Sequence, residues 1–373
     1  MHFAISCGGT GGHTLPGLAT AQALVADGHR VTLVLTDRAT DRTTAATWAG
    51  PHLVFPADYL SARHPVRSLK AILTLRRSRA AAIRAFRADR PDAVLVMGSY
   101  ASFPAASAAV ACGIPLVLHE SNVIPGRLVE WFALKAAAIA AGFEELRDHL
   151  RGGREVLVAT GTPVRPELVR GAALALAARG VGDGSRSVTP HLLVTGGSQG
   201  ARSLNTAAAE AFIRLCAEGV PFAATHLAGQ ADYERVAGLY AAAKARPNVT
   251  VLPFSADMAT HYGKADFALT RAGASTLAEL VAFRLPALLV PYPLAAKDHQ
   301  MANARAVQGT GAVAVVADAE LTSDGLHDYL KALLAAPDRL AAMRAAYASS
   351  SLPDPAEAPK RLAALLVRVA KEQ

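Results

Sequence analysis

The sequence has little cysteine, and its three cysteines are far apart. Cys7, Cys112 and Cys216 are an odd number and form no C-x-x-C pair. This excludes a disulfide framework and a zinc site built on paired cysteines, and it fits a reducing cytosol.

The sequence also lacks segments that would carry the chain into or across a membrane. Its first residues, MHFAISCGG, have no basic region, and the apolar run ends at a glycine, so no signal peptide is predicted. The longest uncharged stretch, Met97 to Leu118, is interrupted by Pro104, Gly113 and Pro115. It predicts a helix, a turn and a buried strand rather than a transmembrane helix.

Acidic residues are scarce in one part of a chain whose net charge is +8. Residues 63–90 contain nine Lys or Arg and a single acid, Asp89, with apolar residues at the spacing of one helical face. Two interpretations stay open: a surface helix that packs on its own domain, or a basic amphipathic surface that meets anionic lipid. Nucleic acid is not predicted as a partner, because no aromatic platform or known module accompanies the charge.

Short apolar runs alternate with alanine-rich helical segments along the chain. The first half has HFAISC, RVTLVLT, DAVLVM, PLVLH and EVLVAT, and the second half has HLLVT, VTVLPF, ADFALT, PALLVP and AVAVV. Runs that are apolar on both faces suit a parallel sheet covered by helices on both sides. The pattern predicts an α/β fold with two doubly wound Rossmann-like domains, each opening with a strand, a glycine loop and a helix.

The predicted domains are residues 1–163 and 164–350, followed by a C-terminal helix within 351–373. A segment rich in Gly, Ser and Thr, 179–190, is interpreted as a surface loop or linker near the boundary. Ligands in such sheets bind at the carboxyl ends of the strands, so the cleft between the domains is the predicted site.

The first glycine loop, ISCGGTGGHTLPG, precedes a helix expected from about Leu15 to Asp27. Its Gly-Thr-Gly at residues 9–11 begins the dinucleotide fingerprint, but Thr14 stands where the third glycine is required. The Gly-Lys-Ser/Thr end of a P-loop is also missing. The loop therefore predicts a phosphate or sugar site with neither familiar signature, and His13 follows it directly.

The second half repeats the device and adds polar residues suited to a nucleotide. TGGSQGARSLN joins a strand to a helix whose first amides could meet an anion. In TRAGASTLAE, the amides of Ala274 and Ser275 would face a diphosphate. Glu279 either complements the helix dipole or accepts hydrogen bonds from a ribose diol. Gln300, in the next such loop, suits sugar hydroxyls or a surface position.

In the first half, LVLHESN places His119, Glu120 and Asn122 directly after a strand, at the end where ligands bind. TGTPVR supplies Arg165 at the crossing between the domains. Its guanidinium would suit a phosphate or form an inter-domain salt bridge.

Taken in order, GGTGGH, HESN, TGTPVR, GGSQGA, RAGASTLAE and KDHQMANA resemble the MurG family, from Gly8 to about Val307. The resemblance implies a GT-B fold of two Rossmann-like domains facing a cleft, with a last helix that commonly crosses back to the first domain. It implies inverting transfer of N-acetylglucosamine from UDP-GlcNAc to the muramyl 4-hydroxyl of undecaprenyl-diphospho-MurNAc-pentapeptide (lipid I), which forms lipid II of peptidoglycan synthesis. It also implies a peripheral position on the cytoplasmic face of the bacterial cell membrane, which favours an anionic membrane as the partner of residues 63–90.

The resemblance assigns His13 as the proposed catalytic base and His119, Glu120 and Tyr100 to the acceptor side. The positions that match donor-binding residues of the family are Thr10, Gly11, Gly12, Asn122, Arg165, Ser198, Ser255, Ala274, Ser275, Thr276, Leu277, Ala278, Glu279 and Gln300.

The chain departs from the family pattern at a few positions. HESN replaces the more familiar HEQN, and Ser255 stands where isoleucine often touches uracil through a backbone contact that serine could preserve. Ser99 precedes Tyr100 where a second glycine is common, and Phe103 replaces an expected glycine. The last two departures concern the acceptor side and leave the identity of the donor unaffected.

In the implied reaction the acceptor hydroxyl attacks the anomeric carbon and UDP leaves. His13, with an ordinary pKa of about 6.5, would take the proton, unless it only caps the loop. Helix-terminal amides and Arg165 would stabilise the departing diphosphate. The chain has no Asp-x-Asp, so no tightly bound metal or cofactor is predicted, and assistance by Mg²⁺ stays open.

Four alternatives remain. A NAD-dependent dehydrogenase would use Asp37 at the end of the second strand, but Thr14 breaks its fingerprint. A UDP-sugar epimerase would share the fold and need no lipid. A non-catalytic sugar-nucleotide binder would not need His13, Asn122, Glu279 and Gln300 together. A glycosyltransferase with another lipid acceptor, such as a diacylglycerol, is the nearest competitor.

Overall fold

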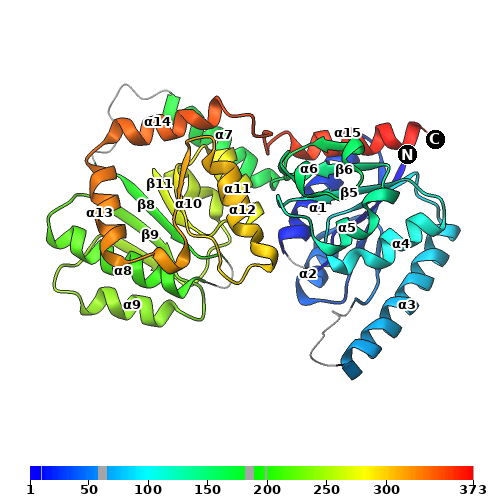
Figure 1. Ribbon diagram of the computed structural model, residues 1–373, viewed down its shortest axis with the longest axis horizontal. Helices are drawn as coiled ribbons and strands as arrows, with labels where there is room; N and C mark the ends of the chain where they lie inside the picture. The colour runs from blue at the N-terminus through cyan, green and yellow to red at the C-terminus, as the bar shows by residue number, and fades with distance from the viewer. Residues whose placement is uncertain (10, 58–64, 181–188, 198–199, 373) are drawn as a thin grey trace. The chain divides into compact units, whose positions relative to one another are not determined.

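The computed structural model describes residues 1–9, 11–57, 65–180, 189–197 and 200–372 (Figure 1). The chain forms two compact units, of which unit 1 comprises Met1–Arg165 and Pro353–Gln373 and unit 2 comprises Pro166–Leu352. The sequence predicted these divisions two residues earlier, after residues 163 and 350.

Unit 1 is built on a parallel sheet of seven strands in the order β3-β2-β1-β4-β5-β6-β7. Its strands are β1 (His2–Ser6), β2 (Arg30–Leu35), β3 (His52–Val54), β4 (Ala93–Val96), β5 (Leu116–Glu120), β6 (Ala138–Ala141) and β7 (Leu157–Ala159). Its α-helices are α1 (Gly11–Ala26), α2 (Ala39–Thr47), α3 (Pro65–Ala88), α4 (Phe103–Ala111), α5 (Arg127–Phe132), α6 (Leu146–His149) and α15 (Ala358–Lys371). Short 3₁₀ turns are η1 (Tyr100–Ser102), η2 (Ala133–Lys135) and η3 (Arg154–Val156).

The strands of unit 1 are buried on both faces, as their continuous apolar runs predict. In β1, Phe3 and Ile5 pack with residues of α1 and α15 on one face, whereas Ala4 packs with residues of α3 and α4 on the other. This alternation follows from the period of two in a strand. Helices on both faces make the sheet doubly wound.

The C-terminal helix α15 belongs to unit 1 by its packing. Leu362 and Leu366 are fully buried and lie in the same cluster as Phe3 and Leu24. Figure 1 shows α15 in red along the blue and green elements of this unit. The last residues of the chain therefore complete the core that the first residues begin.

Unit 2 repeats the plan with a parallel sheet of six strands in the order β10-β9-β8-β11-β12-β13. Its strands are β8 (His191–Thr195), β9 (Ala223–Leu227), β10 (Val249–Leu252), β11 (Phe267–Thr270), β12 (Ala287–Leu289) and β13 (Val313–Val315). Its helices are α7 (Pro166–Gly180), α8 (Arg202–Ala217), α9 (Tyr233–Ala242), α10 (Met258–Lys264), α11 (Ala274–Phe283), α12 (His299–Gln308), α13 (Ser323–Leu334) and α14 (Pro337–Ala348), with 3₁₀ turns η4 (Ala296–Asp298) and η5 (Asp318–Glu320).

In each unit the glycine loop follows the strand at which the order of successive strands across the sheet reverses. In unit 1 the chain winds outward from β1 through β2 to β3, then returns to β4 on the other side of β1. In unit 2 the same reversal lies between β8 and β11. The loops after these strands flank the crevice in which doubly wound sheets bind ligands.

The α/β class and the two doubly wound domains predicted from the sequence are confirmed. Three strands, β3, β6 and β9, were not predicted, and α1 begins at Gly11 rather than near Leu15. Most of the segment 179–190 lies outside the described residues, but the units divide well before it, at Arg165. This segment therefore does not divide the units, and its interpretation as a surface loop stays a prediction. Within the described residues no helix is both long and apolar enough to cross a membrane.

Candidate active site

A buried carboxylate holds the first glycine loop in place. Asp41, on α2, accepts hydrogen bonds from the Gly9 amide at 3.0 and 3.2 Å, from the Thr36 amide at 2.9 Å and from the Thr14 hydroxyl at 3.3 Å. The Thr36 hydroxyl also donates to it. Asp41 has no exposed surface, so these donors replace the water that the charge has lost. Its carboxylate fixes the backbone at the end of β1.

The loop after β4 packs directly against this backbone. Gly9 has φ of 125°, and a Cβ there would lie 2.6 Å from Ser99 Oγ. The Ser99 oxygen itself accepts from the Ala101 amide at 3.2 Å and caps η1. The two loops that flank the crevice of unit 1 can approach this closely only because residue 9 has no side chain.

His13 lies in the first turn of α1, beside this crevice. Its side chain is partly exposed, and burial of the ring lowers its pKa to about 4. The imidazole is therefore neutral at pH 7 and keeps a lone pair that can accept a proton. A Cβ at Gly98 would lie 4.0 Å from His13 Cδ2 and 2.9 Å from the His119 carbonyl oxygen, so these residues share one corner of the sheet edge.

In the HESN motif, His119 and Glu120 hold neighbouring groups in place, and Glu120 orients the Asn122 side chain. Glu120 is buried and accepts from the Asn122 amide at 3.0 Å, from Asn122 Nδ2 at 2.9 Å and from the Gly126 amide at 2.8 Å. His119 is fully buried and donates through Nε2 to the Gly161 carbonyl at 3.2 Å. Both residues act on the site by holding backbone and side chain in place. Asn122 is the member of the motif whose amide Glu120 orients.

Tyr100 and Phe103 lie at a separate feature of unit 1. Together with Trp131 and residues of α3 they surround a hollow of about 470 Å³, which we call the aromatic hollow. It is lined by Ile72, Leu75, Arg76, Arg79, Tyr100, Phe103 and Trp131. The Phe103 side chain, which replaces an expected glycine, makes edge contacts with Trp131 and Phe132 and so builds one wall.

The basic segment forms the helix α3, which packs on its own unit as the first of the two interpretations predicts. Some of its apolar side chains nevertheless stay exposed. Ala71, Leu75, Ala82 and Phe86 are buried, and the last two lie in one cluster with residues of α4. Ile72 and Leu73 are 43% and 47% exposed. The arginines that the structure describes on this helix, from Arg76 to Arg87, are exposed. An apolar and a basic surface therefore lie side by side at the aromatic hollow.

In unit 2 a buried network supports the second glycine loop. Asn205, from the SLN of that motif, donates through Nδ2 to the Ala228 carbonyl at 2.8 Å and to Asp232 at 2.7 Å. Its oxygen pairs with His226 Nε2 at 3.1 Å, and His226 Nδ1 lies 3.0 Å from the Tyr240 hydroxyl. Burial lowers the pKa of His226 to about 4, which keeps the ring neutral in this network.

The helix α11 presents the residues expected to meet a nucleotide. Gly273 precedes it, and Ala274, Ser275 and Thr276 form its first turn, where the amides have no partner within the helix. Leu277 and Ala278 are buried, so only their backbone could face a ligand. Glu279 follows, partly exposed, and the Tyr262 hydroxyl donates to its Oε2 at 2.8 Å. Tyr262 therefore orients the carboxylate.

Gln300 is held through one end of its amide. Its Oε1 accepts from the Ala272 amide at 3.2 Å and from the Tyr292 amide at 2.9 Å. Two backbone donors fix which end is oxygen, and the NH₂ group remains to donate. The Ser255 hydroxyl, by contrast, is engaged within unit 2: it lies 2.9 Å from His261 Nε2 of α10 and accepts from the Asp257 amide at 3.2 Å.

Of the remaining predicted site residues, the structure describes Arg165, Gly11 and Gly12. Arg165 is partly exposed and is the last residue of unit 1 before the chain enters unit 2. Gly11 and Gly12 begin α1. Thr10 and Ser198 lie outside the described residues, and their roles stay predictions.

Sequence reasoning missed the residues that act through others. Asp41 is the clearest case: the dehydrogenase alternative drew attention to Asp37, which is exposed, while Asp41 one helical turn later is fully buried. The usable signal was an aspartate in the first turn of the helix after the second strand. Tyr262 carries no local signal, because α10 and α11 are separated by a strand and meet only in the fold.

The two sheet edges thus carry complementary chemistry. Unit 1 offers a neutral histidine and an oriented asparagine amide beside a glycine loop, and unit 2 offers helix-terminal amides, a carboxylate and a glutamine amide. Such groups suit an anion with hydroxylated sugars attached to it. Within the described parts of the chain, no cluster of three or more His, Cys, Asp or Glu could hold a metal ion.

Two family descriptions match the chain: the glycosyltransferase family 28 N-terminal domain over residues 3–141, and its C-terminal domain over residues 191–358. The UDP-N-acetylglucosamine–N-acetylmuramyl-(pentapeptide) pyrophosphoryl-undecaprenol N-acetylglucosamine transferase of Rhizobium meliloti (strain 1021) is 36% identical over 364 residues. The match covers 97% of this chain and 94% of that protein.

Among solved structures, Acinetobacter baumannii MurG superposes with a TM-score of 0.78 at 27% identity, covering 98% of this chain and 99% of that one. The UDP-GlcNAc 2-epimerase of Neisseria meningitidis bound to UDP-GlcNAc superposes with a TM-score of 0.68 at 12% identity, covering 100% of each chain. At that identity the likeness shows the fold alone. The GT-B class expected from the sequence is confirmed.

The buried histidines make stability depend on pH. His119 in unit 1 and His226 in unit 2 each have a pKa lowered to about 4 by burial, against an ordinary value of 6.5. Between these values the unfolded chain binds more protons, so the free energy of unfolding falls as pH falls, by about 1.4 kcal/mol per pH unit for each histidine. Urea unfolding at pH 7, 6 and 5 measures this slope.

The matched comparison is His226→Gln against His52→Gln, since His52 is exposed. We expect the first substitution to flatten the slope and the second to leave it unchanged. Equal slopes in wild type and His226→Gln would contradict the assignment.

Proposed function

The chain belongs to the UDP-N-acetylglucosamine–N-acetylmuramyl-(pentapeptide) pyrophosphoryl-undecaprenol N-acetylglucosamine transferases, the MurG family within glycosyltransferase family 28, and we propose that it makes lipid II. It transfers N-acetylglucosamine from UDP-GlcNAc to the muramyl 4-hydroxyl of undecaprenyl-diphospho-MurNAc-pentapeptide. The observation that carries this function is a relationship at 36% identity over 97% of the chain, which confirms the resemblance seen in the motifs.

Unit 2 takes the donor in this proposal. The amides of Ala274 and Ser275, at the start of α11, face the diphosphate, where the helix dipole favours negative charge. Glu279, oriented by Tyr262, accepts hydrogen bonds from the ribose hydroxyls. Gln300 donates its NH₂ group to an oxygen of the sugar, because its own oxygen is already engaged.

Unit 1 takes the acceptor and supplies the base. His13 is neutral at pH 7 and therefore able to accept the proton of the 4-hydroxyl as that oxygen attacks the anomeric carbon. A base with a pKa near 4 is weak, and an anionic diphosphate bound close by would raise that pKa toward the working range. Asn122, held by Glu120, is proposed to contact the donor sugar.

The departing diphosphate gathers negative charge as UDP leaves. Arg165 and the helix-terminal amides are the proposed groups that stabilise it, and they do so as fixed dipoles and charge without a dedicated metal site. We propose that the protein binds no metal or cofactor tightly. An Mg²⁺ ion carried by the diphosphate itself is compatible with this arrangement.

The aromatic hollow of unit 1 also suits contact with a membrane. The aromatic hollow places Trp131, 48% exposed, beside Arg76 and Arg79. Aromatic and apolar side chains next to arginines suit the boundary between headgroups and acyl chains of an anionic bilayer. We propose that this face of α3 holds the protein peripherally at the cytoplasmic side of the bacterial membrane, where a lipid-linked acceptor is found.

The test of the reaction uses labelled UDP-GlcNAc and a short-chain analogue of the lipid-linked muramyl-pentapeptide. We expect transfer by the wild type and a loss of about 10²–10⁴-fold in kcat for His13→Ala, the range for removal of a general base. His52→Ala, an exposed histidine of the same unit, serves as the control and should keep full activity.

Other outcomes separate the alternatives. Conversion of UDP-GlcNAc to an epimer without acceptor would establish an epimerase and contradict the transferase. Transfer to diacylglycerol but not to the muramyl lipid would show a glycosyltransferase with a different lipid acceptor and contradict the synthesis of lipid II. Unimpaired transfer by His13→Ala would keep the function and remove His13 as its base.

The membrane contact is tested by sedimentation with vesicles of phosphatidylglycerol and phosphatidylcholine. Because each basic residue near an anionic surface contributes about 1 kcal/mol, Arg76→Glu with Arg79→Glu should weaken binding at least about tenfold. Lys244→Glu with Arg246→Glu, which changes two exposed basic residues of unit 2, is the charge-matched control. Equal vesicle binding by all three proteins would contradict the assigned surface.

A further inference from the structure

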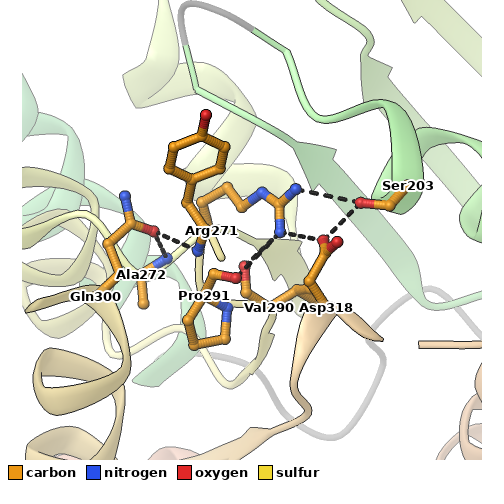
Figure 2. Close-up of polar contacts among 8 residues, drawn as sticks. Ser203, Arg271, Ala272, Val290, Pro291, Gln300 and Asp318 are labelled. Atoms are coloured by element: carbon orange, nitrogen blue, oxygen red, sulfur yellow. Dashed lines mark hydrogen bonds and ion pairs between the residues drawn. The ribbon is translucent and has the colours of Figure 1, made fainter. Parts of the chain in front are cut away.

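The arginine that opens the RAGAST motif is occupied by the protein itself. Arg271 Nη1 donates to Asp318 Oδ1 at 2.5 Å and to the carbonyls of Val290 and Pro291 at 3.0 and 3.2 Å (Figure 2). Its Nη2 donates to Ser203 Oγ at 3.2 Å. Only 11% of the Arg271 side chain and 18% of that of Asp318 is exposed. The charge of Arg271 is therefore balanced within unit 2 rather than offered to a diphosphate.

These contacts join loops from four strands at the carboxyl edge of the sheet. Arg271 follows β11, Val290 and Pro291 follow β12, and Asp318 follows β13. Ser203, near the start of the helix after β8, donates to Asp318 at 2.6 Å. We call Arg271, Asp318 and Ser203 the arginine junction.

The two backbone amides that hold Gln300 each belong to a residue next to one of the junction's contacts. Ala272, which donates to Gln300 Oε1, is the next residue after Arg271, and Tyr292, the other donor, is the next residue after Pro291. Arg271 holds the Val290 and Pro291 carbonyls, and its guanidinium lies 5.8 Å from the centre of the Tyr292 ring. Figure 2 shows the Gln300 oxygen turned toward Ala272 and its nitrogen turned away.

We propose that Asp318 is a positioning residue for the donor sugar. By holding Arg271 it fixes the two backbone amides that orient Gln300, so that Gln300 presents a hydrogen-bond donor to the sugar. This inference rests on the proposed function, in which UDP-GlcNAc is the donor. Asp318 itself touches no substrate.

These contacts predict that loss of Asp318 weakens binding of the donor's sugar and leaves binding of its nucleotide unchanged. Glu279 is oriented by Tyr262 from α10, and none of the junction's described contacts involves either residue. Without Asp318, a mostly buried guanidinium would lose its counter-charge and shift toward water, away from the Val290 and Pro291 carbonyls. Gln300 would then lose the geometry of its two amide donors, while the ribose contact would remain.

The experiment compares the dissociation constants of UDP-GlcNAc and UDP by titration calorimetry. For Asp318→Ala we expect UDP-GlcNAc to bind about tenfold more weakly, as for loss of one hydrogen bond between Gln300 and the sugar, while the dissociation constant for UDP changes less than about twofold. Asp318→Asn keeps an acceptor for Arg271 and should fall between wild type and Asp318→Ala. It also serves if the alanine variant does not fold.

Asp324→Ala is the matched control, since Asp324 also pairs with an arginine of unit 2, Arg214, but on the exposed surface. A double-mutant cycle adds a sharper criterion: in a Gln300→Ala background, Asp318→Ala should weaken UDP-GlcNAc binding no further.

The outcomes distinguish this inference from the proposed function. If wild type binds both ligands and Asp318→Ala weakens them equally, or weakens neither, the junction is structural only and the inference is overturned. Additive effects of Asp318→Ala and Gln300→Ala would overturn it as well. If wild type binds UDP-GlcNAc not at all, the proposed donor is wrong, and the inference falls with it.

Discussion

A glycine loop has few side chains of its own to hold it, so neighbouring residues must impose its shape. In unit 1 the buried carboxylate of Asp41 does so, accepting hydrogen bonds from the backbone of two loops at once. A carboxylate without exposed surface is stable only while every donor stays in place. The same carboxylate therefore holds the Gly9 and Thr36 backbones together near His13.

Unit 2 uses the opposite charge to hold other loops at the carboxyl edge of its sheet. There a guanidinium with several fixed donors gathers the ends of β11, β12 and β13 and the start of α8, where unit 1 uses a carboxylate with several acceptor sites. In both units the anchoring charge is consumed by the protein. Most of the groups proposed to meet the ligand are dipoles: helix-terminal amides, the Asn122 and Gln300 side chains and a neutral imidazole. Arg165 and the Glu279 carboxylate are the proposed groups that carry a charge. Dipoles can stabilise an anion without adding net charge that would hold the product diphosphate too tightly.

Much of this could be predicted from the sequence, because strands, glycine turns and helix starts leave local signals. The apolar runs predicted most strands, and the motifs placed His13, Asn122, Glu279 and Gln300 at strand ends. The strand β6, with the sequence AIAA, was missed because alanine favours helices, and only burial on both faces makes it a strand. The start of α1 was predicted too late, because glycine disfavours a helix interior and the sequence has glycines at positions 11 and 12. In the structure both lie in the first turn of α1, where glycine is tolerated.

The supporting residues could not be predicted, because their partners are distant in sequence. Asp318 meets Arg271 and Ser203 across 47 and 115 positions, and no local pattern encodes such a meeting. His119 shows the converse: its motif suggested the acceptor side, while the fold buries it completely against Gly161. A motif thus identifies residues that matter, and only the packing shows which of them meet a substrate and which hold the others in place.

The binding of UDP-GlcNAc by unit 2, at the sheet edge between α11 and α12, is the proposal on which the rest depends. A crystal structure of the protein with UDP-GlcNAc would test it. We expect the ribose hydroxyls on the Glu279 carboxylate, diphosphate oxygens at the first amides of α11, and the NH₂ group of Gln300 on a sugar oxygen. The proposal would be wrong if the donor bound elsewhere. It would also be wrong if the Gln300 oxygen left the amides of Ala272 and Tyr292 and met the sugar instead.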